Sequence, residues 1–223
     1  MKNRIKAFLI HLFFSLTIVI SCIGIISNYY YPSFFYSLCS INEFIEIMLP
    51  AYIVLGPALT FIIYKKGKPG LFFDLIVILF LQAGVLLYGS YQLLENRPAY
   101  LLFYDDTFYI VPLKALHHEQ SFFQPQLAWF DSSSLTAKEK TDLAFENFTK
   151  GIPFPFLQRF YRPLGTINVA IMREKAQKLD SVQKTYPQKA LDESLLYFPA
   201  IGRTRSFTIA FDPINKIPVD VLK

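Results

Sequence analysis

The pattern of hydrophobic and polar positions divides the chain into two parts. Residues 7–94 contain only six charged side chains, and long apolar runs cover 7–26, 44–64 and 71–94. A hydrocarbon core about 30 Å thick needs roughly 20 helical residues. Residues 1–94 are therefore predicted to form three transmembrane helices. Residues 95–223 mix charged and apolar residues in ordinary proportion, and we expect them to form a separate small domain outside the bilayer.

The basic residues of the first part predict its orientation. Every Lys and Arg before Arg97 lies near the N terminus or in the turn KKGKPG, residues 65–70. Short loops rich in Lys and Arg stay in the cytoplasm. We therefore expect a cytoplasmic N terminus, with residues 27–43 and the whole of 95–223 on the opposite side. The run MKNRIK followed by apolar residues would also fit a cleaved signal, but the apolar run continues to Ile26, which favours a retained helix.

Composition narrows the possible partners and the redox chemistry. The chain is 53% hydrophobic and 17% charged, and much of its net charge of +5 comes from the membrane part. No basic stripe suggests nucleic acid, so the charge indicates orientation instead. Cys22 and Cys39 could form at most one disulfide, which would require the chain to fold back.

Gly56 and Pro57 interrupt the second apolar run. Proline removes a backbone donor and kinks a helix, which a membrane tolerates where a neighbouring helix covers the defect. Glycine permits close approach of another backbone. Two interpretations stay open: packing against the other two helices, or a docking groove for a partner's helix.

Polar residues mark both ends of the predicted helices. Ser40 and Glu43 have the spacing of a capping box, and Glu46 could cap the same helix or meet a partner's polar group. The aromatic loop NYYYPSFFYS has the composition of an interfacial belt. Near the predicted cytoplasmic ends of the helices, next to the lysines of the turn, ionisable groups lie at similar depth and predict a structural polar cluster. We expect Gln82 to be a hydrogen-bond donor between helices. The members of the predicted cluster are His11, Lys66, Asp74 and Gln82.

Three stretches within about the first 110 residues carry a family resemblance: RIKAFLIHLFFSL, LGPALTFIIYKKGKPGLFFDLIVILFLQAGVLLYGSY and RPAYLLFYDDTFYIV. Together they resemble the type IV pilin accessory proteins of the TfpX/TfpZ family. Matching positions in the predicted helices include His11, Ser15, Gly56, Pro57, Thr60, Lys66, Asp74, Gln82 and Gly89. Tyr52 departs from the pattern, because members often carry an acidic residue one turn before the Gly-Pro pair.

The resemblance implies a multi-pass protein of the bacterial inner membrane with a periplasmic C-terminal domain. Its implied partner, besides the lipid bilayer, is the major type IV pilin, through both the transmembrane helix and the head of that pilin. Its implied role is to modulate pilin stability or pilus assembly. It transfers no catalytic residue.

The second part of the chain predicts an α+β domain. AYLLFY and TFYIV flank Asp105 and Asp106 as a hairpin, and Thr136 with Glu139 forms a capping box for a helix to about Lys150. INVAIMREKAQKLDSVQ has helical apolar spacing, and RSFTIAFD and IPVDVL alternate as strands. Strands at both ends with helices between them favour a mixed or antiparallel sheet.

The sequence offers little for catalysis. The only cluster with ligand chemistry, residues 117–119 (HHE), lacks the further ligands of a zinc site, and no phosphate-binding or nucleophile motif appears. We therefore expect that the protein is not an enzyme and that it binds no metal ion or cofactor. The stretch GIPFPFLQRFYRPLG alternates aromatic residues with arginines, a composition enriched at protein interfaces, although core packing explains it as well.

These observations give two function hypotheses. The first is a chaperone-like accessory protein that binds pilin, and the alternative is a membrane-anchored sensor or regulatory subunit with a ligand-binding periplasmic domain. The candidate partner-binding residues are Glu46, Tyr52, Gly56, Pro57, Phe154, Phe156, Arg159, Phe160 and Arg162.

Overall fold

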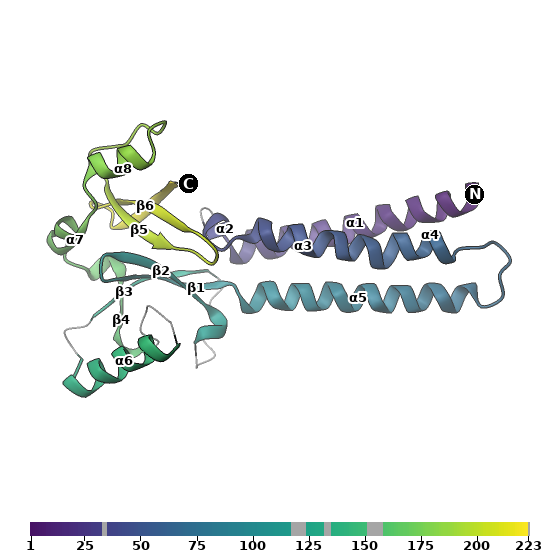
Figure 1. Ribbon diagram of the computed structural model, residues 1–223, viewed down its shortest axis with the longest axis horizontal. Coiled ribbons are helices and arrows are strands. Elements are labelled where there is room, and N and C mark those ends of the chain that lie inside the picture. Colours follow the sequence, from purple (N-terminus) through teal and green to yellow (C-terminus); the bar gives the residue numbers. More distant parts are fainter. Residues whose placement is uncertain (33–34, 117–123, 132–134, 151–157, 223) are drawn as a thin grey trace. The chain divides into compact units, whose positions relative to one another are not determined.

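The computed structural model describes the chain apart from residues 33–34, 117–123, 132–134, 151–157 and 223 (Figure 1). It forms two compact units, which we call the helix unit and the sheet domain. The helix unit comprises Met1–Pro32 and Ser40–Asn96, and the sheet domain comprises Ser33–Cys39 and Arg97–Lys223. Placing Ser33–Cys39 with the sheet domain differs from the expected division at residues 94 and 95.

The helix unit contains three long apolar helices. They are α1 (Lys2–Tyr30), a second helix built from α3 (Ile41–Ile53), a π-helical turn η1 (Val54–Ala58) and α4 (Leu59–Ile63), and α5 (Leu71–Glu95). Within the described residues, these three are long and apolar enough to cross a membrane. They pack against one another along their length (Figure 1). The apolar pattern thus located all three helices.

The irregular second helix follows from its prolines. Pro50 lies inside α3 and Pro57 inside η1. Each proline lacks the backbone donor that would bond the carbonyl four residues earlier. Around Pro57 the chain widens into one π-helical turn, the form in which π-helix mostly occurs within α-helices. The helix start also differs from expectation: Ser40 precedes α3 in a left-handed conformation (φ 53°, ψ 43°), and its side chain makes no cap hydrogen bond.

The sheet domain is built on a mixed sheet of seven strands in the described residues, in the order β4-β3-β1-β2-β5-β6-β7. The pairs β1/β3 and β2/β5 are parallel, and the other neighbours are antiparallel. This confirms an α+β fold with a mixed sheet. The strands are β1 (Pro98–Tyr104), β2 (Thr107–Pro112), β3 (Gln126–Phe130), β4 (Tyr161–Pro163), β5 (Leu196–Ile201), β6 (Ser206–Asp212) and β7 (Ile217–Leu222).

Local sequence signals explain several connections. Asp105 (φ 42°) and Asp106 (φ 70°) turn β1 into β2, as predicted, in the left-handed conformation of a two-residue hairpin loop. The capping box is also confirmed, because the backbone N–H of Thr136 donates to Glu139 Oε2 at 3.0 Å and that of Glu139 donates to Thr136 Oγ1 at 3.3 Å. The remaining short helices are α2 (Phe35–Leu38), α6 (Ala137–Lys150), α7 (Val169–Lys175) and α8 (Leu179–Thr185), with 3-10 turns η2 (Leu113–Ala115), η4 (Gln158–Phe160) and η5 (Leu164–Thr166).

One predicted helix is divided. The run INVAIMREKAQKLDSVQ forms α7 and α8, which are separated because Ala176 and Lys178 adopt extended backbone (ψ 145° and 132°). The apolar spacing of this run nevertheless continues across the break between the two helices. Each short helix has a buried apolar residue: Met172 in α7 and Val182 in α8.

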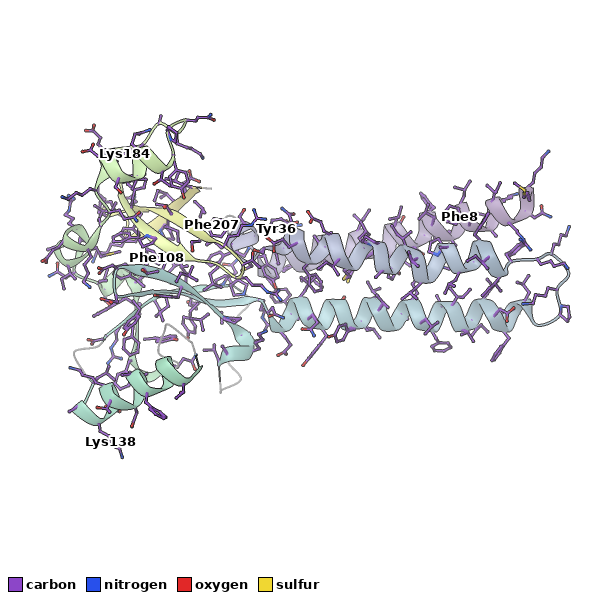
Figure 2. The ribbon with its side chains drawn as sticks, viewed as in Figure 1. Phe8, Tyr36, Phe108, Lys138, Lys184 and Phe207 are labelled. Atoms are coloured by element: carbon purple, nitrogen blue, oxygen red, sulfur yellow. The ribbon has the colours of Figure 1, made fainter. Side chains whose placement is uncertain are left out.

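Strand β1 buries both of its faces, as a central strand with a parallel neighbour does. Leu101 and Phe103 belong to one apolar cluster, together with Phe108, Phe198 and Phe211, whereas Leu102 belongs to a second cluster with Leu143 of α6. Figure 2 labels Phe108 and Phe207 of the first cluster. The first cluster also contains Phe35 (5% exposed) and Leu38 (0%) of α2. Phe35 was expected in an interfacial belt, and for this residue that interpretation is wrong, because Phe35 and Leu38 complete the core of the sheet domain.

Candidate functional site

A polar network links the three helices of the helix unit. His11 of α1 contacts Thr60 Oγ1 through Nδ1 (2.6 Å) and Gln82 Oε1 through Nε2 (2.9 Å). The Gln82 amide nitrogen donates to Ser15 Oγ at 2.8 Å and faces the carbonyl of Tyr52 at 3.5 Å. Gln82 and Thr60 are both almost fully buried. Gln82 is thus an interhelical donor, as the sequence predicted.

The network defines where the protons lie. The Tyr52 carbonyl can only accept, so the Gln82 nitrogen faces it and the Gln82 oxygen faces His11. Because that oxygen also only accepts, His11 Nε2 carries a proton and donates it. In the neutral imidazole, Nδ1 then accepts from the Thr60 hydroxyl. Each polar group in the network has a partner, which is what an apolar surrounding requires.

The side chain of Gln82 packs directly against the backbone of Gly56. A Cβ added to Gly56 would lie only 2.2 Å from the Gln82 amide nitrogen and 2.4 Å from its Cδ. Gly56 and Pro57 are buried in the helix unit. The structure therefore favours internal packing, and the interpretation of Gly56 and Pro57 as an open groove for a partner's helix is wrong. The space is occupied by the protein's own glutamine.

The predicted polar cluster is divided in two. His11 and Gln82 bond to each other, but Asp74 pairs with Lys68 (2.5 Å) and makes no hydrogen bond or ion pair with His11. Lys66 is exposed at the same end of the helices. The reason is that the turn brings Lys68 to the first turn of α5, so Asp74 finds a cation locally.

The residues proposed for partner binding in the membrane have different surroundings. Tyr52 is buried against Val19 and Met48, so it is not on the surface. Glu46 is exposed on a face of the second long helix that also exposes Ile47 and Pro50 of α3 and Val54 of η1. Pro50 cannot donate to the carbonyl of Glu46. This face therefore presents a carboxylate among apolar side chains, and the Glu46 carbonyl lacks its usual donor four residues later.

Of the side chains proposed for partner binding in the sheet domain, one is buried, one is exposed and the others are not described. Phe160 is buried and packs against Phe130 with ring centroids 5.8 Å apart, so core packing explains it. Arg162 is exposed on β4, opposite Trp129 in register. Phe154, Phe156 and the side chain of Arg159 lie outside the described residues.

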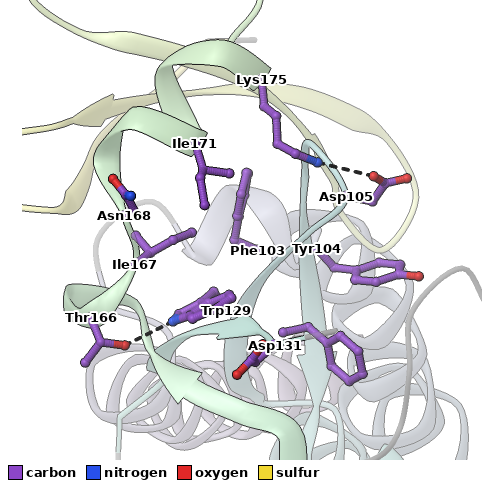
Figure 3. A pocket seen from close by; sticks show the side chains of 11 residues that line it. Phe103, Tyr104, Asp105, Trp129, Asp131, Thr166, Ile167, Asn168, Ile171 and Lys175 are labelled. Atoms are coloured by element: carbon purple, nitrogen blue, oxygen red, sulfur yellow. Dashed lines mark hydrogen bonds and ion pairs between the residues drawn. The ribbon is translucent and has the colours of Figure 1, made fainter. Parts of the chain in front are cut away.

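The sheet domain contains a pocket of about 580 Å³ at the carboxyl ends of β1 and β3 (Figure 3). These strands are parallel neighbours, with Phe103 opposite Trp129 in register. Ligands commonly bind beyond the carboxyl ends of parallel strands. Here the strand ends contribute Tyr104, Asp105 and Asp131, and the chain from η5 into α7 closes the other side with Thr166, Asn168 and Ile171.

Hydrogen bonds and ion pairs fix the pocket walls. The Trp129 indole donates to Thr166 Oγ1 at 3.0 Å, and the Asn168 side chain caps α7 by accepting from the Ala170 N–H. Lys175 lies 2.7 Å from Asp106 and 3.4 Å from Asp105, and the bond to Asp106 raises the pKa of Lys175. Burial raises the pKa of the Tyr104 hydroxyl. The pocket thus offers aromatic surface with carboxylate and amide groups at its edge.

Sequence reasoning missed this pocket. Its signal was that Asp105 and Asp131 each follow directly after a predominantly apolar strand. In the residues that the structure describes, no group of three or more His, Cys, Asp or Glu could hold a metal ion. Residues 117–119 lie outside those ranges. Both cysteines are free.

No family model, no curated protein and no solved structure matches this chain.

Proposed function

We propose that this protein is an accessory protein of the bacterial inner membrane that binds type IV pilin subunits in a chaperone-like manner. In this proposal the N terminus is cytoplasmic and the sheet domain is periplasmic. The three helices contact the pilin's transmembrane helix, and the sheet domain contacts its head. Once one of these two contacts has formed, it holds the pilin near the second binding surface and so raises the effective concentration for the second contact. Neither contact therefore needs to be tight by itself.

The proposal is supported by where the residues that carry the family resemblance lie. His11, Ser15, Gly56, Thr60 and Gln82 come from three separate helices, and in the structure they contact one another. The residues that carry the resemblance therefore form one packed cluster in this chain, and this clustering supports the proposal.

Glu46 supports a partner within the bilayer. It is about five residues into a helix with the length and composition of a membrane span, roughly 7 Å from its start. An exposed carboxylate at such depth is costly unless a partner group meets it. We infer that a pilin helix covers the face of Glu46, Ile47, Pro50 and Val54 and places a cationic or donor group near Glu46.

Photo-crosslinking in cells tests this proposal. A photo-crosslinking amino acid at Ile47 or Val54 should capture a type IV pilin encoded in the same genome. The same amino acid at Phe72 or Phe80, exposed on α5, is the matched control and should capture much less. Glu46→Gln should lower pilin co-purification by about tenfold, as loss of a charge partner does. Equal capture at all four positions, or no pilin captured, would overturn the proposal.

The pocket of the sheet domain favours a second candidate function. A volume of about 580 Å³ lies within the range of small-molecule sites, roughly 300–1,000 Å³. This is consistent with a sensor or regulatory subunit whose periplasmic domain binds a small ligand. Such a protein would require a partner for its cytoplasmic output.

The single tryptophan of the chain separates the two functions, because Trp129 lines this pocket. Titration of the full-length protein with a small-molecule library should change Trp129 fluorescence only if the pocket binds one of the compounds. Saturable quenching that Asn168→Ala abolishes, without pilin crosslinking, would favour the sensor. Pilin crosslinking with no saturable ligand would favour the accessory protein.

A further inference from the structure

A second cavity, of about 650 Å³, lies within the helix unit at its lysine-bearing end. It is an open groove formed by α1, α4 and the beginning of α5, together with Lys66 of the turn. On α1 its lining residues Lys6, Ile10 and Phe14 are spaced four apart, so they form one stripe along the helix. The groove therefore runs parallel to the helices.

The chemistry of the groove changes along its length. Lys6 and Lys66 lie at one end, and Ile10, Phe14 and Leu79 line the remainder. The three apolar side chains are at least half exposed, so the groove opens sideways from the helices. From Lys6 to Phe14 the helix rises about 12 Å. A ligand that fills this groove has an anionic end and an apolar body.

The two lysines are available for such a ligand. Among the described residues, the ion pair at this end of the helices joins Lys68 to Asp74, and no carboxylate pairs with Lys6 or Lys66. A partner's apolar helix laid along the groove would bring hydrocarbon against two ammonium groups. A phospholipid instead meets the lysines with its phosphate and the apolar wall with an acyl chain. Basic pockets between transmembrane helices are known to hold anionic lipid headgroups.

We propose that this groove binds one anionic phospholipid, with the phosphate at Lys6 and Lys66 and an acyl chain along Ile10, Phe14 and Leu79. The inference requires the helices to span a membrane but is independent of pilin binding. The bound acyl chain would also cover the side of the polar network where His11 and Thr60 line the groove. The lipid would thereby shield these hydrogen bonds from water.

Native mass spectrometry of the full-length protein in detergent tests the headgroup contact. Dioleoyl-phosphatidylglycerol should bind about tenfold more tightly than dioleoyl-phosphatidylcholine. The double variant K6Q/K66Q should lose this preference. The matched control K2Q/K65Q removes two exposed lysines from the same end, outside the groove, and should keep the preference within about twofold. Equal losses in both variants, or no preference in the unaltered protein, would overturn the proposal.

A second pair of variants tests the acyl chain contact. Ala7 lines the groove and Ala83 is exposed on α5 away from it. Ala7→Trp should abolish retention of phosphatidylglycerol, whereas Ala83→Trp should not. Glycerophosphoglycerol, the headgroup without acyl chains, should fail to displace the lipid. Displacement by that headgroup would indicate a site for a soluble phosphate, and undiminished retention by Ala7→Trp would show that the groove is not where the lipid lies.

Discussion

At the scale of single residues, two glycines set how closely the helices of the helix unit approach. A Cβ on Gly56 would lie 2.2 Å from Gln82 Nε2, and one on Gly89 would lie 2.3 Å from Met48 Sδ. Gly84, also in an apolar helix, has nothing within 4 Å of its added Cβ. The sequence could predict that Gly56 permits a close approach. It could not show what approaches, because Gln82 reaches Gly56 only through the packing of two helices.

We expect Gly56→Ala to lower the free energy of unfolding of the helix unit by about 1–3 kcal/mol, because the new methyl group would force Gln82 from its hydrogen bonds. Gly84→Ala is the control, and it should be neutral or stabilise by up to about 1 kcal/mol, since the helix gains propensity. Unfolding of the full-length protein in mixed detergent micelles would measure both. Similar effects of the two substitutions would contradict the packing role of Gly56.

Cys39 allows a chemical prediction at the same scale. Burial raises the pKa of its thiol to about 12, although Arg203 acts in the opposite direction. At pH 8 the thiolate is therefore scarce, and the thiolate is the reactive form. In a Cys22→Ser variant, iodoacetamide should label the folded protein on the order of a thousandfold more slowly than the unfolded protein. Comparable rates in the two states would show that Cys39 is accessible.

At the scale of elements, identical sequence signals have different outcomes. Thr136 and Glu139 form the predicted capping box, whereas Ser40 and Glu43 have the same spacing but the side chain of Ser40 makes no cap hydrogen bond. An N-cap side chain reaches the helix from extended backbone, and Ser40 is left-handed. Spacing alone cannot reveal this difference, because the preceding segment determines the backbone of Ser40. The pocket was missed for a related reason: it depends on β1 and β3 being parallel neighbours.

The capping box of α6 should be measurable. Thr136→Ala removes the acceptor for the Glu139 N–H and should lower the free energy of local opening at the start of α6 by about 1 kcal/mol. Amide hydrogen exchange in the first turn reports this opening. Thr141→Ala, on the same helix, is the control, because the Thr141 hydroxyl donates back to the Ala137 carbonyl and does not cap the helix start. Thr141→Ala should leave exchange in the first turn unchanged or slow it, because alanine has the higher helix propensity. Exchange in Thr136→Ala that is no faster than in the unaltered protein would contradict the capping role.

At the scale of the whole molecule, the apolar pattern predicted the three helices because each apolar run has about the 20 residues that a membrane-spanning helix needs. The order of the strands could not be predicted. β2 pairs in parallel with β5, far along the chain, and no local signal specifies that pairing. The sequence also could not predict that Phe35 and Leu38 belong to the core of the sheet domain. Aromatic and apolar residues next to a predicted helix are compatible with a bilayer interface as well as with a protein core.

The proposed orientation makes a prediction for the entire chain. A reporter enzyme that is active only outside the cytoplasm should be active when fused after Lys223 and inactive when fused after Gly67, in the basic turn. A reporter active only in the cytoplasm should give the reverse pattern at both positions. Cytoplasmic activity after Lys223 would contradict the periplasmic placement of the sheet domain and, with it, the proposed contact with a pilin head.

The insertion of α2 into the sheet domain has a consequence for biosynthesis. Phe35 and Leu38 leave the ribosome well before the first strand, and the backbone carbonyl of Leu38 accepts from the Arg203 N–H (3.0 Å) near the other end of the chain. A soluble fragment that starts at Arg97 would lack two side chains of its core. Secreted production of the domain would therefore succeed only if residues 35–39 were supplied with it, and maturation in the cell must wait until translation has passed Arg203.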